Sequence, residues 1–426
     1  MKRLADMTHD ELVRMYRLAH IAFIHCKSLG LKLNMSRGKP GSEQLNLSAG
    51  LVDVPISGQE YLCDGIDIRN YGTLEGLPSC RKLFAEILGV RYEQVFVGGN
   101  ASLTLMYDII AKAYTHGLLH SKQPWSKLSR VKFLCPSPGY DRHFSICKSF
   151  GMEMITVPMT ESGPDMDIVE ELVKDENVKG MWCVPKFSNP DGIIYSDETI
   201  RRIASLRPAA DDFTVMWDNA YCIHEFNSDF ISFANILDEC ERGGNPDMVF
   251  EFCSTSKVTF PGAGVACFAC SEANMEYMKR LIAVQSISSD KVNQYRHVRF
   301  LKDKAGAIKH MKKHAAILKP KFDIVLSFLD NEIAPFGFAR WHEPKGGYFV
   351  SLNTMNGCAK RTHQLCTQAG VVMTEAGATF PNGIDPNDSN LRIAPSYPPE
   401  HELRLAMRVL CTCLKLAAVE KMLGMY

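Results

Sequence analysis

The chain has 426 residues, 46% of them hydrophobic, a length that predicts two or three domains around a large buried core. Lysine plus arginine and aspartate plus glutamate each number 48, so the formal net charge is zero. This balance excludes the basic excess that is typical of nucleic-acid-binding proteins and favours an enzyme that acts on small molecules.

The N-terminal residues predict a helix rather than an export signal. Thr8 and Glu11 have the spacing of a capping box, and an amphipathic pattern follows them. No stretch is apolar for long enough to cross a bilayer, and the fifteen cysteines are scattered through apolar segments. We therefore expect a cytoplasmic protein with buried, reduced thiols and no membrane contact.

Alternating strand-like and helical patterns predict an α/β fold. The expected strands cover residues 95–97, 131–134, 154–157, 180–184, 214–217, 248–252 and 265–269, which makes a mostly parallel seven-stranded sheet covered by helices. Residues 290–330 predict a long helix or a helix pair. Strands at residues 341–352 and 370–374 and a closing helix at residues 400–422 predict a smaller α+β domain.

A loop of small residues joins the first expected strand to an apolar-periodic helix. Backbone N–H groups at such a helix N-terminus can bind an anion, so Asn100, Ala101 and Ser102 are candidates for holding a phosphate. A simple N-cap by Asn100 or Ser102 is the structural alternative.

Polar residues follow three of the expected strands. Asn189 lies in a turn after the fourth strand, Asp218 and Tyr221 follow the fifth, and Lys257 follows the sixth. A lysine amine forms a Schiff base with the aldehyde of pyridoxal phosphate, a carboxylate keeps its ring nitrogen protonated, and a phenol and an amide stabilise its ring oxygen. Each residue alone could be a surface lysine, a turn former or a core tyrosine, but their order predicts a pyridoxal phosphate site.

These segments resemble the landmarks of a known family. They are Asn189-Pro190-Asp191-Gly192, Asp218-Asn219-Ala220-Tyr221 and Ser254-Thr255-Ser256-Lys257, supported by residues 36–40, 290–299, 376–381 and 390–395. They resemble the fold-type I pyridoxal-phosphate-dependent aminotransferases of the aspartate aminotransferase superfamily, and the match looks close to the subgroup Ic (MocR-like) branch. The resemblance covers nearly the whole chain. It implies an N-terminal segment (1–48) that joins a small domain, a large cofactor domain (49–315) and a C-terminal small α+β domain (316–426).

The resemblance also implies roles for cofactor-binding residues. Lys257 is the covalent anchor and proton carrier, Asp218 and Tyr221 tune the ring, and Asn100, Ala101, Ser102, Ser254 and Ser256 bind the phosphate. Tyr140 stacks on the ring, although an ordinary loop tyrosine is the alternative. Many relatives carry an arginine eight residues beyond the lysine, where this chain has Val265. The phosphate must therefore rely more on N–H groups, hydroxyls and another cation.

Substrate-binding residues follow in the same way. The resemblance implies that Arg392 holds the substrate α-carboxylate as a bidentate fork, that Gly38 donates a backbone N–H to the same group, and that Asn189 also contacts the substrate. A structural ion pair is the alternative for Arg392. Tyr71 resembles the residue that reaches the phosphate of the neighbouring subunit, which implies a homodimer with shared active sites, whereas in isolation Tyr71 would be a turn residue.

The function that we predict is ping-pong transamination between an amino acid, expected to be aspartate or glutamate, and a 2-oxo acid. The alternatives are another fold-type I reaction (lyase, decarboxylase or racemase) and a non-catalytic regulatory module without its DNA-binding domain. Four cations could bind a distal carboxylate or be solvated surface charges: Arg37, Lys39, Lys291 and Arg296.

Two further motifs predict no metal or redox site. Cys267 and Cys270 lie in a strand-like run, where residues three apart point to opposite faces. His310 and His314 have helical spacing but lysine neighbours, which predicts a solvated basic face.

Overall fold

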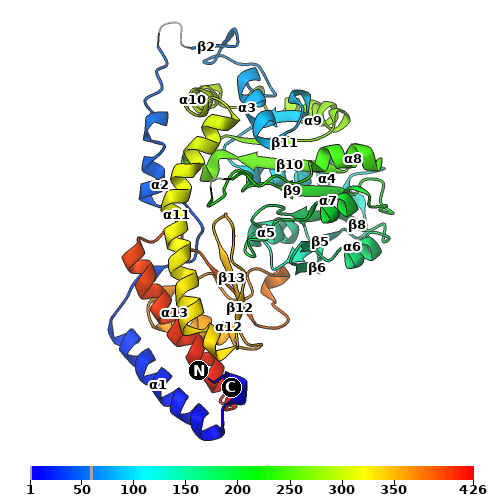
Figure 1. The fold of residues 1–426 in the computed structure, drawn as a ribbon. Helices are drawn as coiled ribbons and strands as arrows, with labels where there is room; N and C mark the ends of the chain where they lie inside the picture. The colour runs from blue at the N-terminus through cyan, green and yellow to red at the C-terminus, as the bar shows by residue number, and fades with distance from the viewer. Residues whose placement is uncertain (1, 58–60, 228) are drawn as a thin grey trace.

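The computed structural model describes residues 2–57, 61–227 and 229–426. Figure 1 shows a large unit built around one sheet and a small unit that carries both termini, with the long helix α11 (Lys304–Glu332) running from one to the other. None of the helices in the described part of the chain combines the length and apolarity needed to cross a bilayer.

The central sheet has the order β4-β11-β10-β9-β8-β5-β6-β7. Strands β10, β9, β8, β5 and β6 are parallel, and β11 is antiparallel to both of its neighbours. The prediction of seven strands is confirmed, and the two-residue β7 adds an eighth. Their bounds are β4 (Val95–Val97), β5 (Lys132–Ser137), β6 (Glu153–Thr160), β7 (Gly163–Pro164), β8 (Val178–Cys183), β9 (Thr214–Asp218), β10 (Val249–Ser254) and β11 (Ala266–Ala269).

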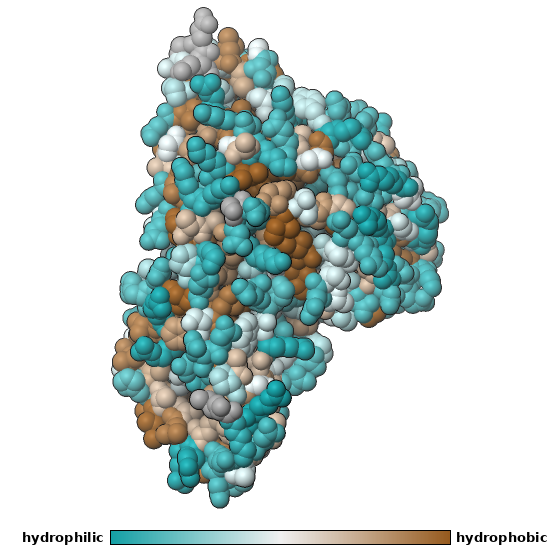
Figure 2. All heavy atoms as spheres, in the orientation of Figure 1, coloured by the Kyte–Doolittle hydropathy of each residue, from teal (hydrophilic) through white to brown (hydrophobic). Residues whose placement is uncertain are grey.

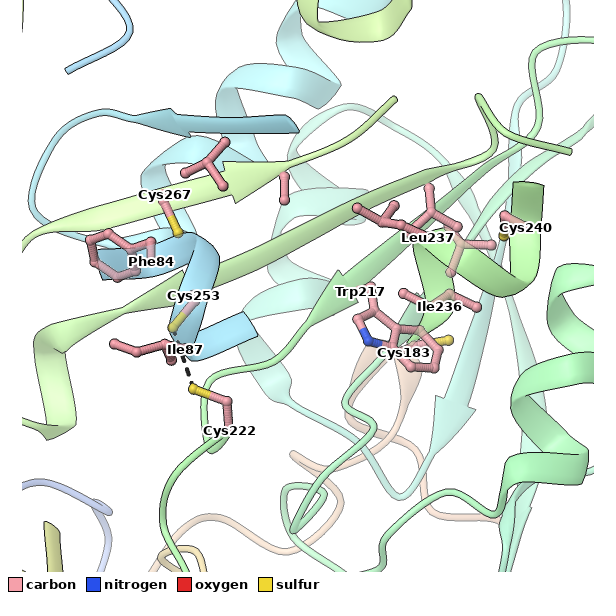
Figure 3. Packing of buried hydrophobic residues seen from close by; sticks show 14 of the residues in the cluster. Phe84, Ile87, Cys183, Trp217, Cys222, Ile236, Leu237, Cys240, Cys253 and Cys267 are labelled. Carbon is pink, nitrogen blue, oxygen red and sulfur yellow. Dashed lines mark hydrogen bonds between the residues drawn. The ribbon is translucent and has the colours of Figure 1, made fainter. Parts of the chain in front are cut away.

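Helices cover both faces of this sheet because successive strand residues point to opposite sides. Val215 and Trp217 pack with Phe84 on one face, whereas Met216 packs with Met106 on the other. Figure 3 shows Trp217 beside Ile236 and Leu237 of a covering helix. The helices of the large unit are α3 (Pro78–Leu88), α4 (Ser102–Thr115), α5 (Asp141–Ser149), α6 (Met166–Leu172), α7 (Asp197–Ala204), α8 (Ile236–Gly243), α9 (Glu272–Gln285) and α10 (Lys291–Leu301); a short hairpin is formed by β2 (Leu62–Cys63) and β3 (Ile66–Asp67).

The small unit has its own core between helices and a three-stranded sheet of order β12-β13-β15. Helix α1 packs along α13, and β1 pairs in parallel with β14. The predicted capping box of Thr8 and Glu11 is confirmed at the start of α1, as is the closing helix. The bounds of the remaining elements are α1 (His9–Ser28), β1 (Leu33–Asn34), β12 (Arg340–Trp341), β13 (Val350–Asn353), α12 (Ala359–Gln368), β14 (Val371–Val372), β15 (Asn390–Ile393) and α13 (Glu400–Met422) in the small unit, and α2 (Ser42–Asn46) beside α11 (Figure 1).

The expectation of strand throughout residues 341–352 is wrong in its middle. Residues 342–349 leave the small sheet and pass over the large unit, where Gly347 donates its N–H to the carbonyl oxygen of His224 at 3.0 Å. A Cβ on Gly346 would lie 2.6 Å from the ring of Phe187, so glycine permits this close approach. The domain boundaries stay a prediction, and the one between residues 315 and 316 falls inside α11.

His310 and His314 are buried, so the prediction of a solvated basic face is wrong for them. The Nε2 atoms of His310 and His314 lie 3.1 Å apart. The carbonyl oxygen of Val258 lies 2.9 Å from Nε2 of His310. Burial lowers the pKa of both rings, to about 4 for His314. The neighbours Lys309, Lys312 and Lys313 are exposed because they occupy the other face of α11.

All fifteen cysteines are free and buried, as predicted. The Sγ atoms of Cys222 and Cys253 lie 3.5 Å apart, and Cys267 sits opposite Cys253 on the neighbouring strand (Figure 3). Burial in these apolar surroundings raises the pKa of the Cys267 thiol and so favours its protonated form.

Candidate active site

A pocket of about 570 Å³ lies at the carboxyl ends of β8, β9 and β10. Loops that follow parallel strands meet at this edge, which is where open α/β sheets bind their ligands. Figure 2 shows hydrophobic side chains gathered at the centre of the viewed face, between the large and small units, while the rest of that face is mostly hydrophilic. Seven of the predicted site residues line the pocket: Gly38, Tyr140, Asn189, Asp218, Tyr221, Lys257 and Arg392.

Lys257 ends a short 3-10 helix, Thr255–Lys257, that directly follows β10. Its Nζ lies 4.9 Å from the centroid of the Tyr221 ring. Desolvation lowers the pKa of the Lys257 amine, and the charge of Asp218 partly opposes this shift. A larger fraction of the amine is therefore neutral near pH 7 than for a surface lysine, and the neutral form is the nucleophile.

Asp218 is the last residue of β9 and is 3% exposed. Its Oδ2 lies 3.0 Å from Nε2 of His143, while its Oδ1 is buried without a hydrogen-bond partner among the described residues. A buried carboxylate oxygen with no donor is costly unless a ligand supplies one. Asp218 is thus a ready acceptor for an N–H group of a molecule in the pocket.

Two aromatic residues shape the pocket around this carboxylate. Tyr221 is buried, and desolvation raises the pKa of its phenol well above the ordinary value, so the phenol is a hydrogen-bond donor. Tyr140 precedes α5 and meets the ring of His143 edge-on, with centroids 5.0 Å apart. Burial raises the pKa of Tyr140 to about 12.

Arg392 comes from the buried strand β15 of the small unit. Its Nη1 donates to Oδ1 of Asp141 at 2.8 Å and to Oδ1 of Asn189 at 3.2 Å. Its Nε and Nη2 both donate to Oγ1 of Thr374. The predicted alternative of a structural ion pair therefore has a real partner, Asp141, which also lines the pocket.

Gly38 lies where no other residue fits, because a Cβ there would meet the ring of Phe349 at 2.3 Å. The same ring lies 4.8 Å from the guanidinium of Arg392. The N-terminal segment thus approaches the pocket beside the arginine, as expected from the sequence, and Gly38 allows that approach.

The predicted phosphate-binding residues lie together at the start of α4. The N-cap of α4 is Ala101, which makes no side-chain capping bond, so the alternative of a cap by Asn100 or Ser102 does not hold. Oγ of Ser254 donates to Oγ of Ser256 at 3.1 Å, and Ser256 Oγ lies 3.5 Å from the carbonyl oxygen of Asn100. This arrangement leaves first-turn N–H groups and two hydroxyls at one place, which suits an anion. Val265 is buried and brings no charge there.

Other candidates lie outside the pocket. Tyr71 is 79% exposed, and its backbone N–H donates to the side chain of Asn70. Lys291 is buried and donates to the carbonyl oxygen of Gly72 at 2.9 Å. Arg296 has a buried Nε that lacks a partner among the described residues, and it is not a lining residue either. Of the four cations considered for a distal carboxylate, only Arg37 and Lys39 line the pocket.

Sequence reasoning missed four residues of the site. His143 holds Asp218 and stacks on Trp182 with centroids 4.3 Å apart, and Thr374 and Asp141 hold Arg392. Arg142 lines the pocket next to Asp141. Asp141, Arg142 and His143 could have been found from the sequence because they form the first turn of the helix that follows Tyr140. Thr374 has no comparable sequence signal.

The fold and the site together define an α/β enzyme of the fold-type I aminotransferase class. The profile of the aspartate aminotransferase family matches residues 7–426, and the chain belongs to this family. The predictions of an aminotransferase and of its superfamily are confirmed, whereas the subgroup stays a prediction.

Individual relatives support this assignment. The chain is 47% identical to an aspartate aminotransferase from Corynebacterium glutamicum over 93% of this chain and 92% of that protein. The crystal structure of an aspartate transaminase from the same organism superposes with a TM-score of 0.97, at 45% identity and over 98% of this chain and 99% of that one. An α-aminoadipate aminotransferase from Thermus thermophilus, solved with N-(5'-phosphopyridoxyl)-L-leucine, shares the fold with a TM-score of 0.72 at 22% identity over 93% and 94% of the two chains.

Proposed function

We propose that the chain binds pyridoxal 5'-phosphate and moves an amino group between aspartate or glutamate and a 2-oxo acid by a ping-pong mechanism. The observation that carries the proposal is the buried Oδ1 of Asp218, which has no hydrogen-bond partner in the described part of the chain and shares its pocket with Lys257 and Arg392. An amine, an acceptor for a protonated ring nitrogen and a carboxylate receptor are the three groups that such a reaction needs.

The residues present fit this cofactor. Asp218 offers Oδ1 to the ring nitrogen, Tyr221 offers a phenol donor, and the start of α4 with Ser254 and Ser256 offers N–H and hydroxyl groups to a phosphate. When bound, pyridoxal phosphate supplies an aldehyde that reacts with amines and a ring that withdraws electrons from the substrate.

The protein's own groups then divide the work. Arg392 binds the substrate α-carboxylate and so orients the Cα–H bond. Lys257, whose lowered pKa favours the neutral amine, takes the proton from Cα as a general base. It then donates this proton, as a general acid, to a different carbon atom. His143 holds Asp218 in place through Oδ2, and Asp218 maintains the positive charge of the ring nitrogen.

The preference for an acidic donor rests on the cations of the pocket and on the name of the 47% identical relative. Arg37 and Arg142 are exposed pocket residues that form no salt bridge in the described part of the chain. Nζ of Lys39, which also lines the pocket, lies 4.0 Å from the centroid of the Tyr397 ring. A distal carboxylate needs such a cation because desolvating the charge alone costs several kcal/mol.

We also propose a homodimer in which Tyr71 completes the site of the partner. A tyrosine that is 79% exposed in the monomer and lies outside its own pocket has the exposure that an interface residue would have. A cytoplasmic location stays a prediction.

Reductive trapping tests the covalent role of Lys257. The purified protein, saturated with pyridoxal phosphate, is treated with sodium borohydride and digested, and mass spectrometry locates the phosphopyridoxyl group. We expect the group on the peptide that contains Lys257 and none in Lys257→Ala, which should also lose transamination. The control is Lys186→Met, which removes a different buried lysine. Labelling of another lysine, or an active Lys257→Ala enzyme, would refute the assignment.

An amino-transfer assay separates transamination from the other fold-type I reactions. We expect one equivalent of the new amino acid for each equivalent of aspartate consumed in the presence of 2-oxoglutarate. Ammonia, carbon dioxide or the D-amino acid as the main product would indicate a lyase, a decarboxylase or a racemase instead.

A further inference from the structure

We propose that Asp141 is an internal substitute for the substrate carboxylate. It forms an ion pair with Arg392 in the free site and is displaced when the substrate binds. This inference rests on the proposed function, since it concerns the same arginine. It makes Asp141 a residue that sets the affinity for every amino acid and 2-oxo acid that uses the pocket.

The donors of Arg392 are almost fully used in the free site. A guanidinium has five N–H donors, and those of Arg392 point to Asp141, Asn189 and Thr374. Both hydrogens of Nη1 are taken, Nε donates to Thr374, and Nη2 shares the same hydroxyl. One hydrogen of Nη2 remains, whereas a carboxylate fork needs two parallel N–H groups. A substrate can therefore form the fork only if one present partner leaves.

Asp141 is the partner that can leave. Asn189 is 4% exposed, and the hydroxyl of Thr374 is fixed because it donates to the carbonyl oxygen of Ser36 at 2.7 Å. The side chain of Asp141 is 32% exposed, and its interaction with Arg392 is the side-chain contact that anchors it in the described structure. It is also the first residue of α5, so rotation of its side chain leaves the helix intact.

The exchange replaces one carboxylate with another, so Arg392 keeps a counter-ion in both states. The side chain of Arg392 is only 8% exposed, and a buried cation without a counter-ion would be strongly destabilising. Asp141 supplies the counter-ion in the free site, and the substrate carboxylate supplies it in the complex. The ring of Phe349, 4.8 Å from the guanidinium, stays against Arg392 in both states and holds its plane.

A competing internal carboxylate weakens the apparent affinity for substrate and helps the product to dissociate. Removing it should therefore tighten the binding of carboxylates, which is the opposite of what the loss of a supporting residue would do. This difference in sign makes the inference testable.

The test compares Asp141→Asn and Asp141→Ala with the wild type in the cofactor-loaded protein. The dissociation constant of succinate, which carries no amino or oxo group, is measured by calorimetry, and KM and kcat are measured for aspartate. We expect succinate to bind about tenfold more tightly and KM to fall by a similar factor, with kcat unchanged or lower. Glu198→Gln, which also removes a carboxylate from the first turn of a helix, is the matched control and should change neither constant.

Unchanged or weaker succinate binding in both variants, measured at a temperature where both are folded, would overturn the role of Asp141. The same result with active wild-type enzyme leaves the proposed function standing. A wild-type protein that transfers no amino group overturns the proposed function itself, so the two failures are distinguishable.

Discussion

Nε2 of His143 lies 3.0 Å from Oδ2 of Asp218, and the other carboxylate oxygen, Oδ1, is buried where no residue that the structure describes donates to it. An ionised carboxylate only accepts hydrogen bonds, so the ring of His143 is the donor. The stacking of His143 on Trp182 fixes the ring, and the ring in turn fixes the carboxylate. The pair therefore prepares one oxygen for a ligand before the ligand arrives.

Asp218→Asn should lower turnover by at least about tenfold because the neutral amide cannot maintain a protonated ring nitrogen. Steady-state kinetics with aspartate and 2-oxoglutarate measure the effect. Glu251→Gln is the control, since Glu251 is a buried carboxylate on the neighbouring strand, opposite Trp217 and outside the pocket. A loss in Asp218→Asn no larger than that in Glu251→Gln would count against the role of Asp218.

Glu251 also predicts a pH dependence of stability. Burial raises the pKa of Glu251 to about 7, against about 4.3 for glutamate in an unfolded chain. Between these pH values the folded protein keeps a proton that the unfolded chain releases, so stability falls as the pH rises through this window. Well above pH 7 the ionised, buried carboxylate costs on the order of 4 kcal/mol, which Glu251→Gln should remove.

The melting temperatures of wild type and Glu251→Gln should therefore diverge with pH. The variant retains an oxygen that can accept the hydrogen bond from Asn219, so its gain over wild type should be small at pH 5 and larger at pH 8. A gap that stays constant between these pH values would show that Glu251 does not titrate in this range.

Arg37→Ala and Arg142→Ala test which cation binds a distal carboxylate. Loss of a charge-assisted hydrogen bond costs about 1.5–3 kcal/mol, so the responsible variant should lose roughly 10–100-fold in kcat/KM for aspartate and little for alanine. Lys148→Ala, which removes an exposed cation from the same helix as Arg142, is the control. Equal losses of kcat/KM for aspartate and alanine would show that neither arginine binds the distal carboxylate.

Shared active sites predict complementation between inactive chains. A mixture of Lys257→Ala and Tyr71→Phe chains, unfolded together and refolded, contains hybrid dimers in which one site has both native residues. We expect activity above that of either variant alone, measured with aspartate and 2-oxoglutarate. Sedimentation of an active monomer, or no gain on mixing, would contradict the proposed dimer.

The sheet and most of the pocket could be predicted from the sequence because both depend on local order. Asp218 and Lys257 each follow a short apolar run, and parallel strands necessarily bring their carboxyl ends to one edge. The same argument predicts Asn189 at this edge, because it follows β8. Arg392 is predicted from the resemblance of residues 390–395 to the family.

Residues that act through distant partners could not be predicted in this way. His314 lies 3.1 Å from the side chain of Gln44, which is 270 positions away, and this partner makes its burial possible. Asp141 reaches Arg392 across 251 positions. Periodicity along one segment carries no information on such pairs, so the sequence wrongly predicts a solvated His314 and predicts no role for Asp141.

Helix α11 belongs to two cores at once. Near its start Ala307 and Met311 pack in the core of the large unit, and near its end Val325 and Leu329 pack in that of the small unit. Its 29 residues span about 43 Å, so one continuous helix, with Pro320 in its interior, links the two parts. Unfolding either part would remove the packing that this part provides to the helix. We therefore expect the whole chain to melt in one cooperative transition.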